Sequence, residues 1–225
     1  MDNVFFLVFF LLVPLLLVGS LVYSLWQDRQ RREQLMVITG QLGLTFTPKL
    51  EQWEQSHGHF SHFALCNQGR HRRIRHYSTK TLINGTSIAI FDYQYVTGHG
   101  KNRRTHQMTV FYARQAEMRL PQFRLHPEIP VFHAIAKRFG MQDINFDSHP
   151  QFSRTYLLRG ENEFLVRWAF PSSVLELFER NPNYVVEAGG QEFLLWQQDR
   201  LVPPPQWSAF LQLGQELVQR WSRAA

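Results

Sequence analysis

An uninterrupted apolar run near the N-terminus constrains this chain more than any other feature. Residues 4–26 read VFFLVFFLLVPLLLVGSLVYSLW and contain no charged side chain. As a helix they would measure about 34 Å at ~1.5 Å per residue, and a bilayer core is ~30 Å thick. Pro14 removes one backbone hydrogen bond, a defect that transmembrane helices tolerate. We therefore expect residues 1–27 to form a transmembrane anchor that contacts the lipid bilayer through residues 4–26.

A cleaved signal peptide is the main alternative for this segment. Such a peptide has a positively charged start, a shorter apolar core and a cleavage site made of small residues. Met1, Asp2 and Asn3 carry no positive charge, and residues 17–24 (LVGSLVYS) make a poor cleavage site. We expect the helix to be retained.

Basic residues predict the orientation of this helix. Arg29, Arg31 and Arg32 follow the apolar run directly, whereas no Lys or Arg precedes it. Loops rich in Lys and Arg stay on the cytoplasmic side of a membrane. The sequence therefore predicts a single-pass protein whose C-terminal domain lies in the cytoplasm.

The part of the chain after the anchor is basic and almost free of cysteine. All 24 Lys and Arg residues lie there, against 17 of the 18 acidic residues. A basic surface favours contact with phosphate groups in lipid or nucleic acid. Cys66 is the single cysteine, so no intrachain disulfide can form, which suits a reducing compartment.

Hydrophobic periodicity predicts an α+β fold, with the anchor followed by a soluble domain of antiparallel sheet or sheets and several packing helices. We expect a juxtamembrane helix at 28–43 and the soluble domain at 44–225, with a possible subdivision near 120–150. Residues 70–113 carry the clearest strand signal. They read as three antiparallel strands, joined by a turn at Asn84-Gly85 and by a glycine-rich tip at 98–104.

The rest of the chain mixes short strands and helices. We expect a strand at 44–47 and further strands near 121–128, 153–160, 184–187 and 192–196, with a hairpin loop at 188–191. Helices are predicted at 131–139, at 171–180 and after Pro203, Pro204 and Pro205. In the last helix one apolar stripe predicts core packing: Trp207, Phe210, Leu211, Gly214, Leu217, Val218 and Trp221.

Several runs of the sequence resemble a group of uncharacterised bacterial proteins. These runs are IAIFDYQYVTGHGKNRRTHQMTVFYAR at 88–114, LPQFRLHPE at 120–128, RFGMQDINFDSHPQFSRTYLLRG at 138–160 and VEAGG at 186–190. The group consists of single-pass membrane proteins with a soluble domain of unknown function. The resemblance covers most of the chain after residue 40. It implies a bacterial inner-membrane location and brings no catalytic residue.

A candidate metal site lies between the first strand and the basic one. His57, His59, His62 and Cys66 offer four nitrogen or sulfur ligands of the kind that zinc accepts. Their spacing is not that of an established zinc finger. The alternative is a histidine-rich surface loop, and no other cofactor is expected.

Seven basic side chains make up a candidate basic patch: Arg70, Arg72, Arg73 and Arg75 in the first of the three strands predicted over 70–113, and Lys101, Arg103 and Arg104 at the hairpin tip. Because side chains alternate along a strand, Arg73 and Arg75 would face away from Arg70 and Arg72. At most half of the patch can therefore serve one ligand. Anionic lipid headgroups are the candidate ligand, and nucleic acid is not expected because no recognition module accompanies the charges. A solvated basic edge strand is the simpler interpretation.

Asp143, Asp147 and His149 form a third group with acid–base or metal-binding potential. Asp147, Ser148 and Pro150 are also typical of an ordinary turn. The sequence contains no P-loop, GxSxG, HExxH or Rossmann pattern. We assign no catalytic or cofactor-binding residue on this basis.

Two functional hypotheses follow from these patterns. The first is a non-enzymatic interaction or scaffold module, anchored in the membrane and facing the cytoplasm, with a protein partner that the sequence does not identify. The second is a metal-dependent or hydrolytic enzyme at the membrane surface, which would use the candidate metal site or the Asp143 and His149 region.

Overall fold

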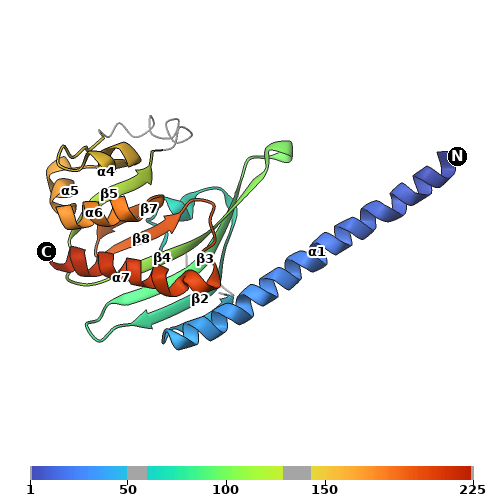
Figure 1. Cartoon of the computed structure of the whole chain (residues 1–225), viewed down its shortest axis with the longest axis horizontal. Coiled ribbons are helices and arrows are strands. Elements are labelled where there is room, and N and C mark those ends of the chain that lie inside the picture. The colour runs from blue at the N-terminus through green and yellow to red at the C-terminus, as the bar shows by residue number, and fades with distance from the viewer. Residues whose placement is uncertain (1, 50–59, 129–142, 224–225) are drawn as a thin grey trace.

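One long helix, α1 (Asp2–Gln41), leads the chain into an antiparallel sheet (Figure 1). The structure is a computed structural model that describes residues 2–49, 60–128 and 143–223. The further helices are α4 (Pro150–Thr155), α5 (Glu163–Ala169), α6 (Ser172–Arg180) and α7 (Trp207–Arg223). The strands are β1 (Thr45–Lys49), β2 (Arg70–Thr81), β3 (Ser87–Thr97), β4 (Arg104–Arg114), β5 (Leu120–Pro127), β6 (Tyr156–Gly160), β7 (Tyr184–Gly190) and β8 (Glu192–Gln197).

The predicted α+β class is confirmed, and eight strands form one sheet in the order β1-β2-β3-β4-β8-β7-β5-β6. All neighbours pair antiparallel. The three strands predicted over 70–113 are β2, β3 and β4. The turn at Asn84-Gly85 is also confirmed: Gly85 has a φ of +78°, and the Asn84 side chain accepts a hydrogen bond from the Thr86 N–H at 3.2 Å.

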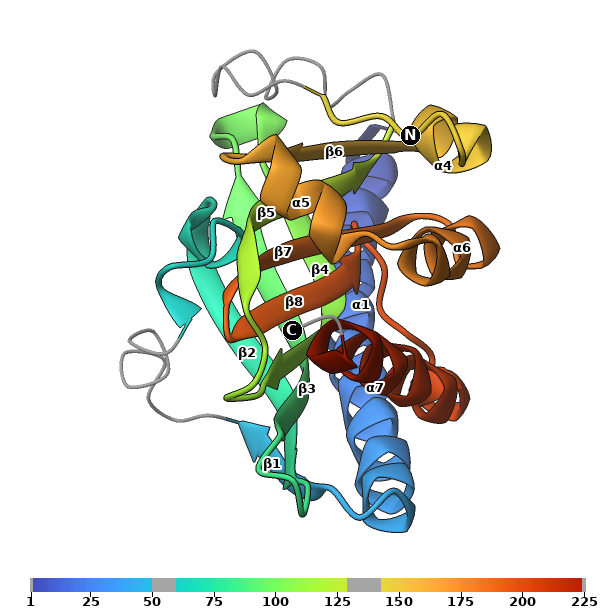
Figure 2. The same cartoon turned by 90° about the vertical axis from the view of Figure 1, so that its left-hand side faces the viewer.

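Both faces of the central strands are covered. On one face, Ile88 and Ile90 of β3 and Phe111 of β4 belong to a core shared with α1, α6 and α7. On the other face, Phe91 and Tyr93 pack in a second core with residues from 60–66. Figure 2 shows α1, α6 and α7 together on one side of the sheet. This double coverage explains why β3 is buried almost throughout its length.

The apolar stripe of α7 packs into the first core, as predicted. Trp207, Leu217 and Trp221 are almost completely buried. Gly214 allows the closest approach, because a Cβ atom there would lie 2.4 Å from the ring of Phe111. The helix therefore lies against β4 at a distance that only glycine permits at that position.

Three local expectations were wrong or incomplete. Residues 153–155 end helix α4, which begins with Pro150 in the first turn, and the strand starts only at Tyr156. Helix α5 was not expected, and the Asn162 side chain caps it by accepting from the Leu165 N–H at 3.1 Å. The β7–β8 connection is tighter than predicted, since pairing continues to Gly189 and Glu192. The helix predicted at 131–139 lies outside the described residues.

The N-terminal helix is continuous through the predicted boundary between anchor and juxtamembrane segment. Along the side chains that the structure describes from residue 12 to 26, the large apolar groups are exposed, from 48% at Leu12 to 70% at Leu15. The part of α1 nearest the N-terminus extends away from the sheet (Figure 1). Among the described residues, no helix has both the length and the apolar character to cross a bilayer.

Candidate functional site

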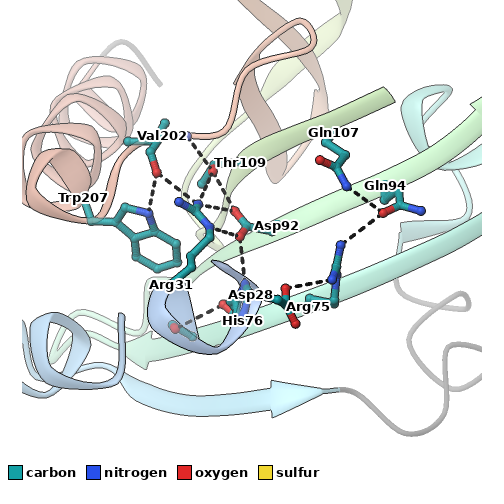
Figure 3. A network of polar contacts seen from close by, with 11 residues as sticks. Asp28, Arg31, Arg75, His76, Asp92, Gln94, Gln107, Thr109, Val202 and Trp207 are labelled. Atoms are coloured by element: carbon teal, nitrogen blue, oxygen red, sulfur yellow. Dashed lines mark hydrogen bonds and ion pairs between the residues drawn. The ribbon is translucent and has the colours of Figure 1, made fainter. Parts of the chain in front are cut away.

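A buried ion pair joins α1 to the sheet (Figure 3). Arg31 donates from Nε to Asp92 Oδ2 at 2.7 Å and from Nη2 to Oδ1 at 2.9 Å. The two side chains expose only 16% and 7% of their surface. Bidentate pairing of this kind fixes geometry as well as charge. We call Arg31, His76, Asp92 and Thr109 the Arg31 junction.

The same junction reaches the segment that precedes α7. Thr109 Oγ1 donates to Asp92 Oδ1 at 2.7 Å and accepts from the Val202 N–H at 2.9 Å. Arg31 Nη2 donates to the Val202 carbonyl at 3.0 Å, and Trp207 Nε1 donates to that carbonyl at 3.3 Å. Helix α1, strands β3 and β4 and the start of α7 are therefore held at one point (Figure 3).

His76 completes the junction from an irregular position in β2. The β2–β3 register shifts between Arg75 and Ser78, and His76 adopts a φ of +52°, which is uncommon for a residue other than glycine. This bulge brings His76 Nδ1 to 2.8 Å from Asp92 Oδ2. Burial alone would raise the pKa of Asp92, but hydrogen bonds from His76, Arg31 and Thr109, with the charge of Arg31, hold it below its ordinary value.

A second line of polar contacts continues from the junction toward the solvent. Arg75 donates from Nη1 to Asp28 Oδ1 at 2.8 Å and from Nη2 to Gln94 Oε1 at 3.1 Å. Gln107 Nε2 also donates to Gln94 Oε1, at 2.9 Å. The cavity beside these groups measures about 30 Å³, whereas substrate pockets usually measure ~300–1,000 Å³. The site is therefore suited to holding α1 in place and is too small for a substrate.

A larger hollow of about 480 Å³ lies where α6 begins and α7 ends. Arg220 crosses it, donating to the Ser173 carbonyl and pairing with Glu216. These polar groups engage one another on an open surface.

The seven residues of the basic patch fall into two groups, two with internal contacts and five that are exposed. Arg72 donates to the Cys66 carbonyl at 2.7 Å, and Arg75 is used in the contact with Asp28. The other five are exposed: Arg70, Arg73, Lys101, Arg103 and Arg104. The prediction that Arg73 and Arg75 face away from Arg70 and Arg72 assumed that side chains alternate regularly along β2. His71 has a φ of +51°, which interrupts that alternation.

The base of the β3–β4 hairpin is fixed by Asp199. It pairs with Arg104 at 2.7 Å and with His106 at 2.6 Å. The His106 ring stacks on Tyr95 with the ring centres 4.6 Å apart, and its other nitrogen lies 2.9 Å from Thr97 Oγ1. The hairpin therefore projects from a rigid base.

The residues of the candidate metal site have separate surroundings as far as the structure describes them. His57 and His59 lie outside the described residues. His62 Nε2 lies 2.9 Å from Glu192 Oε1, and Cys66 is buried in the second core. Burial and the nearby Glu187 raise the pKa of the Cys66 thiol to about 12, which disfavours the thiolate that zinc prefers. The part of the chain that is described contains no group of three or more metal-ligating side chains.

Glu187 is a buried carboxyl that the sequence did not single out. It accepts a hydrogen bond from the Leu65 N–H at 3.1 Å and pairs with Arg124. Burial raises its pKa, and Arg124 together with backbone N–H groups offsets part of this effect. The group fastens residues 64–65 to β7 and so helps to cover the second face of the sheet.

The third predicted group does not converge on one point among the described side chains. Asp143 and Asp147 are exposed, and Asp147 and Ser148 form the turn that the sequence predicted. His149 lies at the start of α4 and contacts Ser148 Oγ at 3.0 Å. These residues serve the entry into α4.

Comparisons with known proteins give a likeness of fold. No protein-family model matches the chain, and no curated protein matches it in sequence. Among solved structures, the crystal structure of the mycobacterial trehalose monomycolate transport factor A, TtfA, is similar with a TM-score of 0.60 and 10% sequence identity. The likeness covers 85% of this chain and 94% of TtfA. The chain is therefore similar in fold to a transport factor from mycobacteria.

Proposed function

We propose that this protein is a membrane-tethered interaction module without catalytic activity, which presents its α+β domain at the cytoplasmic face of the inner membrane. Residues 4–26 are the anchor in this proposal. A protein partner bound by the domain would be brought to, or organised at, the membrane surface.

One observation carries the proposal: α1 is a single helix with two different environments. Near its C-terminal end Arg31 is locked to Asp92, and Leu35 is completely buried in the first core. Among the side chains described from residue 12 to 26, the large apolar ones are at least 48% exposed. A helix that is apolar all round belongs in a core or in a membrane. The uncharged run at 4–26 supports the membrane.

The likeness to TtfA supports an accessory role. That protein is named for a part in transport and not for a reaction that it catalyses. At 10% identity the likeness supports the general role of a non-catalytic factor. The small size of the cavity beside the Arg31 junction agrees with this idea.

Affinity purification tests the proposal. The full-length protein would be crosslinked in intact membranes, purified in mild detergent and analysed for proteins, metals and small molecules. We expect one protein to be enriched in a fixed ratio. A matched control would carry Leu15→Arg and Val18→Arg, which place two charges in the apolar segment, where each costs about 2.5–3.5 kcal/mol on insertion. Enrichment of a small molecule or metal alone would contradict the module and favour an enzyme.

A further inference from the structure

We propose that the tip of the β3–β4 hairpin docks on anionic lipid headgroups of the bilayer that holds the anchor. Four exposed basic residues form this surface, which we call the basic tip: Arg70, Lys101, Arg103 and Arg104. The inference rests on the proposed function, because it requires residues 4–26 to lie in the membrane. It adds a second membrane contact, made by the domain itself.

The position of the basic tip follows from strand direction. β1 returns from the C-terminal end of α1, and β3 runs parallel to β1 because both pair antiparallel with β2. β3 therefore runs toward the N-terminal end of α1. Both views show the hairpin tip and that end of the helix toward the same end of the molecule, at the top (Figure 1 and Figure 2).

The reach of the hairpin is sufficient for contact. Asp92 and Arg31 lie at the same level, since they form the ion pair. From Asp92 to Thr97 the strand extends about 17 Å at ~3.3 Å per residue. From Arg31 to Trp26 the helix extends about 7.5 Å at ~1.5 Å per residue. Even on a path inclined to the helix, the tip reaches the level where the apolar segment begins and headgroups lie.

The charge of the basic tip is complementary to an anionic surface. Residues 93–106 and 68–76 contain no Asp or Glu. Arg104 pairs with Asp199, whereas Lys101 and Arg103 are exposed and form no ion pair within the described ranges. Each basic residue close to an anionic membrane strengthens binding roughly fivefold.

The tip is also built to keep its shape. Arg70 donates to the Gly98 carbonyl at 2.9 Å, and its Nη1 lies 2.8 Å from His99 Nδ1. Gly98 has a φ of +68°, and a Cβ there would lie 2.1 Å from the Asn102 carbonyl oxygen. With the base fixed by Asp199, little conformational entropy is lost when the tip binds a surface.

Lipid fits the tip better than nucleic acid does. Single-stranded nucleic acid is bound by basic grooves that also offer aromatic side chains for stacking. Residues 97–105 contain no Phe, Tyr or Trp, and Tyr95 is buried beside His106. The tip thus presents charge without a stacking surface.

The test places a reporter in the tip of the full-length protein. Asn102→Cys would carry a fluorophore, while Cys66, which is 1% exposed, stays unlabelled. The protein would be reconstituted in vesicles of phosphatidylcholine alone or mixed with phosphatidylglycerol, with a quencher on the lipid headgroups. We expect stronger quenching in the anionic vesicles, reversed by high salt. The double variant Lys101→Gln/Arg103→Gln should shift the docking equilibrium roughly 25-fold toward the free tip.

A matched control separates this effect from total charge. Arg114→Gln/Arg154→Gln also removes two exposed positive charges, one at the end of β4 opposite to the hairpin tip and one in α4, and should leave quenching unchanged. Equal quenching in both lipids, or equal loss in both double variants, would overturn the inference. Salt-sensitive binding of an oligonucleotide at the tip without a lipid response would also overturn it. A protein that does not stay in the vesicles would instead refute the anchor.

Discussion

Asp92 carries a charge in a strand whose neighbours on the same face are Ile88 and Ile90, and Arg31 neutralises it from a position 61 residues earlier in the chain. A buried charge without a partner costs far more than the pair contributes. The Arg31 junction therefore fixes where α1 crosses the sheet, because any other position leaves a charge unmatched.

Replacing Arg31 by Met tests this role. We expect the free energy of unfolding to fall by about 3–5 kcal/mol, because Asp92 stays buried without its cation. Arg29 supplies the matched control, since it lies on the same helix but its side chain is 70% exposed and pairs with the nearby Glu33. Arg29→Met should leave stability unchanged in a denaturant titration in mild detergent. Equal losses of unfolding free energy in the two variants would show that the Arg31 junction contributes no more to stability than an exposed ion pair.

The pH dependence of stability gives a second test at this scale. The folded-state pKa of Asp92 lies below its unfolded value of ~3.9. Its contribution to stability is therefore complete above that value and is lost as the pH falls through the folded-state pKa. The stability difference between wild type and Asp92→Asn should be large near neutral pH and shrink in strong acid. A difference that stays constant over this range would contradict the assignment.

The contact between α7 and β4 is a property of these two elements and depends on Gly214. Gly214→Ala should lower the free energy of unfolding by about 1–3 kcal/mol, because the new methyl group meets the Phe111 ring. Gly40→Ala is the control, since a Cβ there has nothing within 4 Å and alanine suits a helix better than glycine. Thermal unfolding of both variants gives the comparison. An unchanged free energy of unfolding in Gly214→Ala would mean that α7 can move away from the sheet without loss of stability.

Elements with local signals could be predicted from the sequence. The alternation in β3 and the Asn84-Gly85 turn fix the β2–β3 hairpin within a short stretch of chain, and the apolar stripe of α7 repeats at helical spacing. The pairing of β4 with β8 joins residues about 80 positions apart, and no local pattern encodes it. Helices α4 and α5 are too short for a periodic signal.

The candidate site was only partly predictable for the same reason. Asp92 on an apolar face was a usable signal, because a buried carboxylate requires a partner. The position of Arg31 in the sequence indicates only the orientation of the helix, and nothing near it in sequence points to β3. The basic residues were found by composition, but internal contacts that occupy Arg72 and Arg75 depend on the tertiary structure.

For the whole molecule, the arrangement of α1 is the central feature. Its C-terminal part is a component of the core, and its N-terminal part leaves the domain toward the end of the molecule to which the β3–β4 hairpin also points (Figure 1). We expect the domain to be held close to the bilayer, with an orientation fixed by the Arg31 junction.

Alkaline carbonate extraction of membranes that contain the full-length protein tests this account most directly. The protein should remain in the membrane pellet, because the proposed anchor at residues 4–26 would measure about 34 Å as a helix, against a bilayer core of ~30 Å. Leu15→Arg/Val18→Arg should be released. Met36→Arg/Val37→Arg, which adds two charges at exposed positions beside the domain, should be retained. Release of the wild-type protein into the supernatant would contradict the membrane anchor.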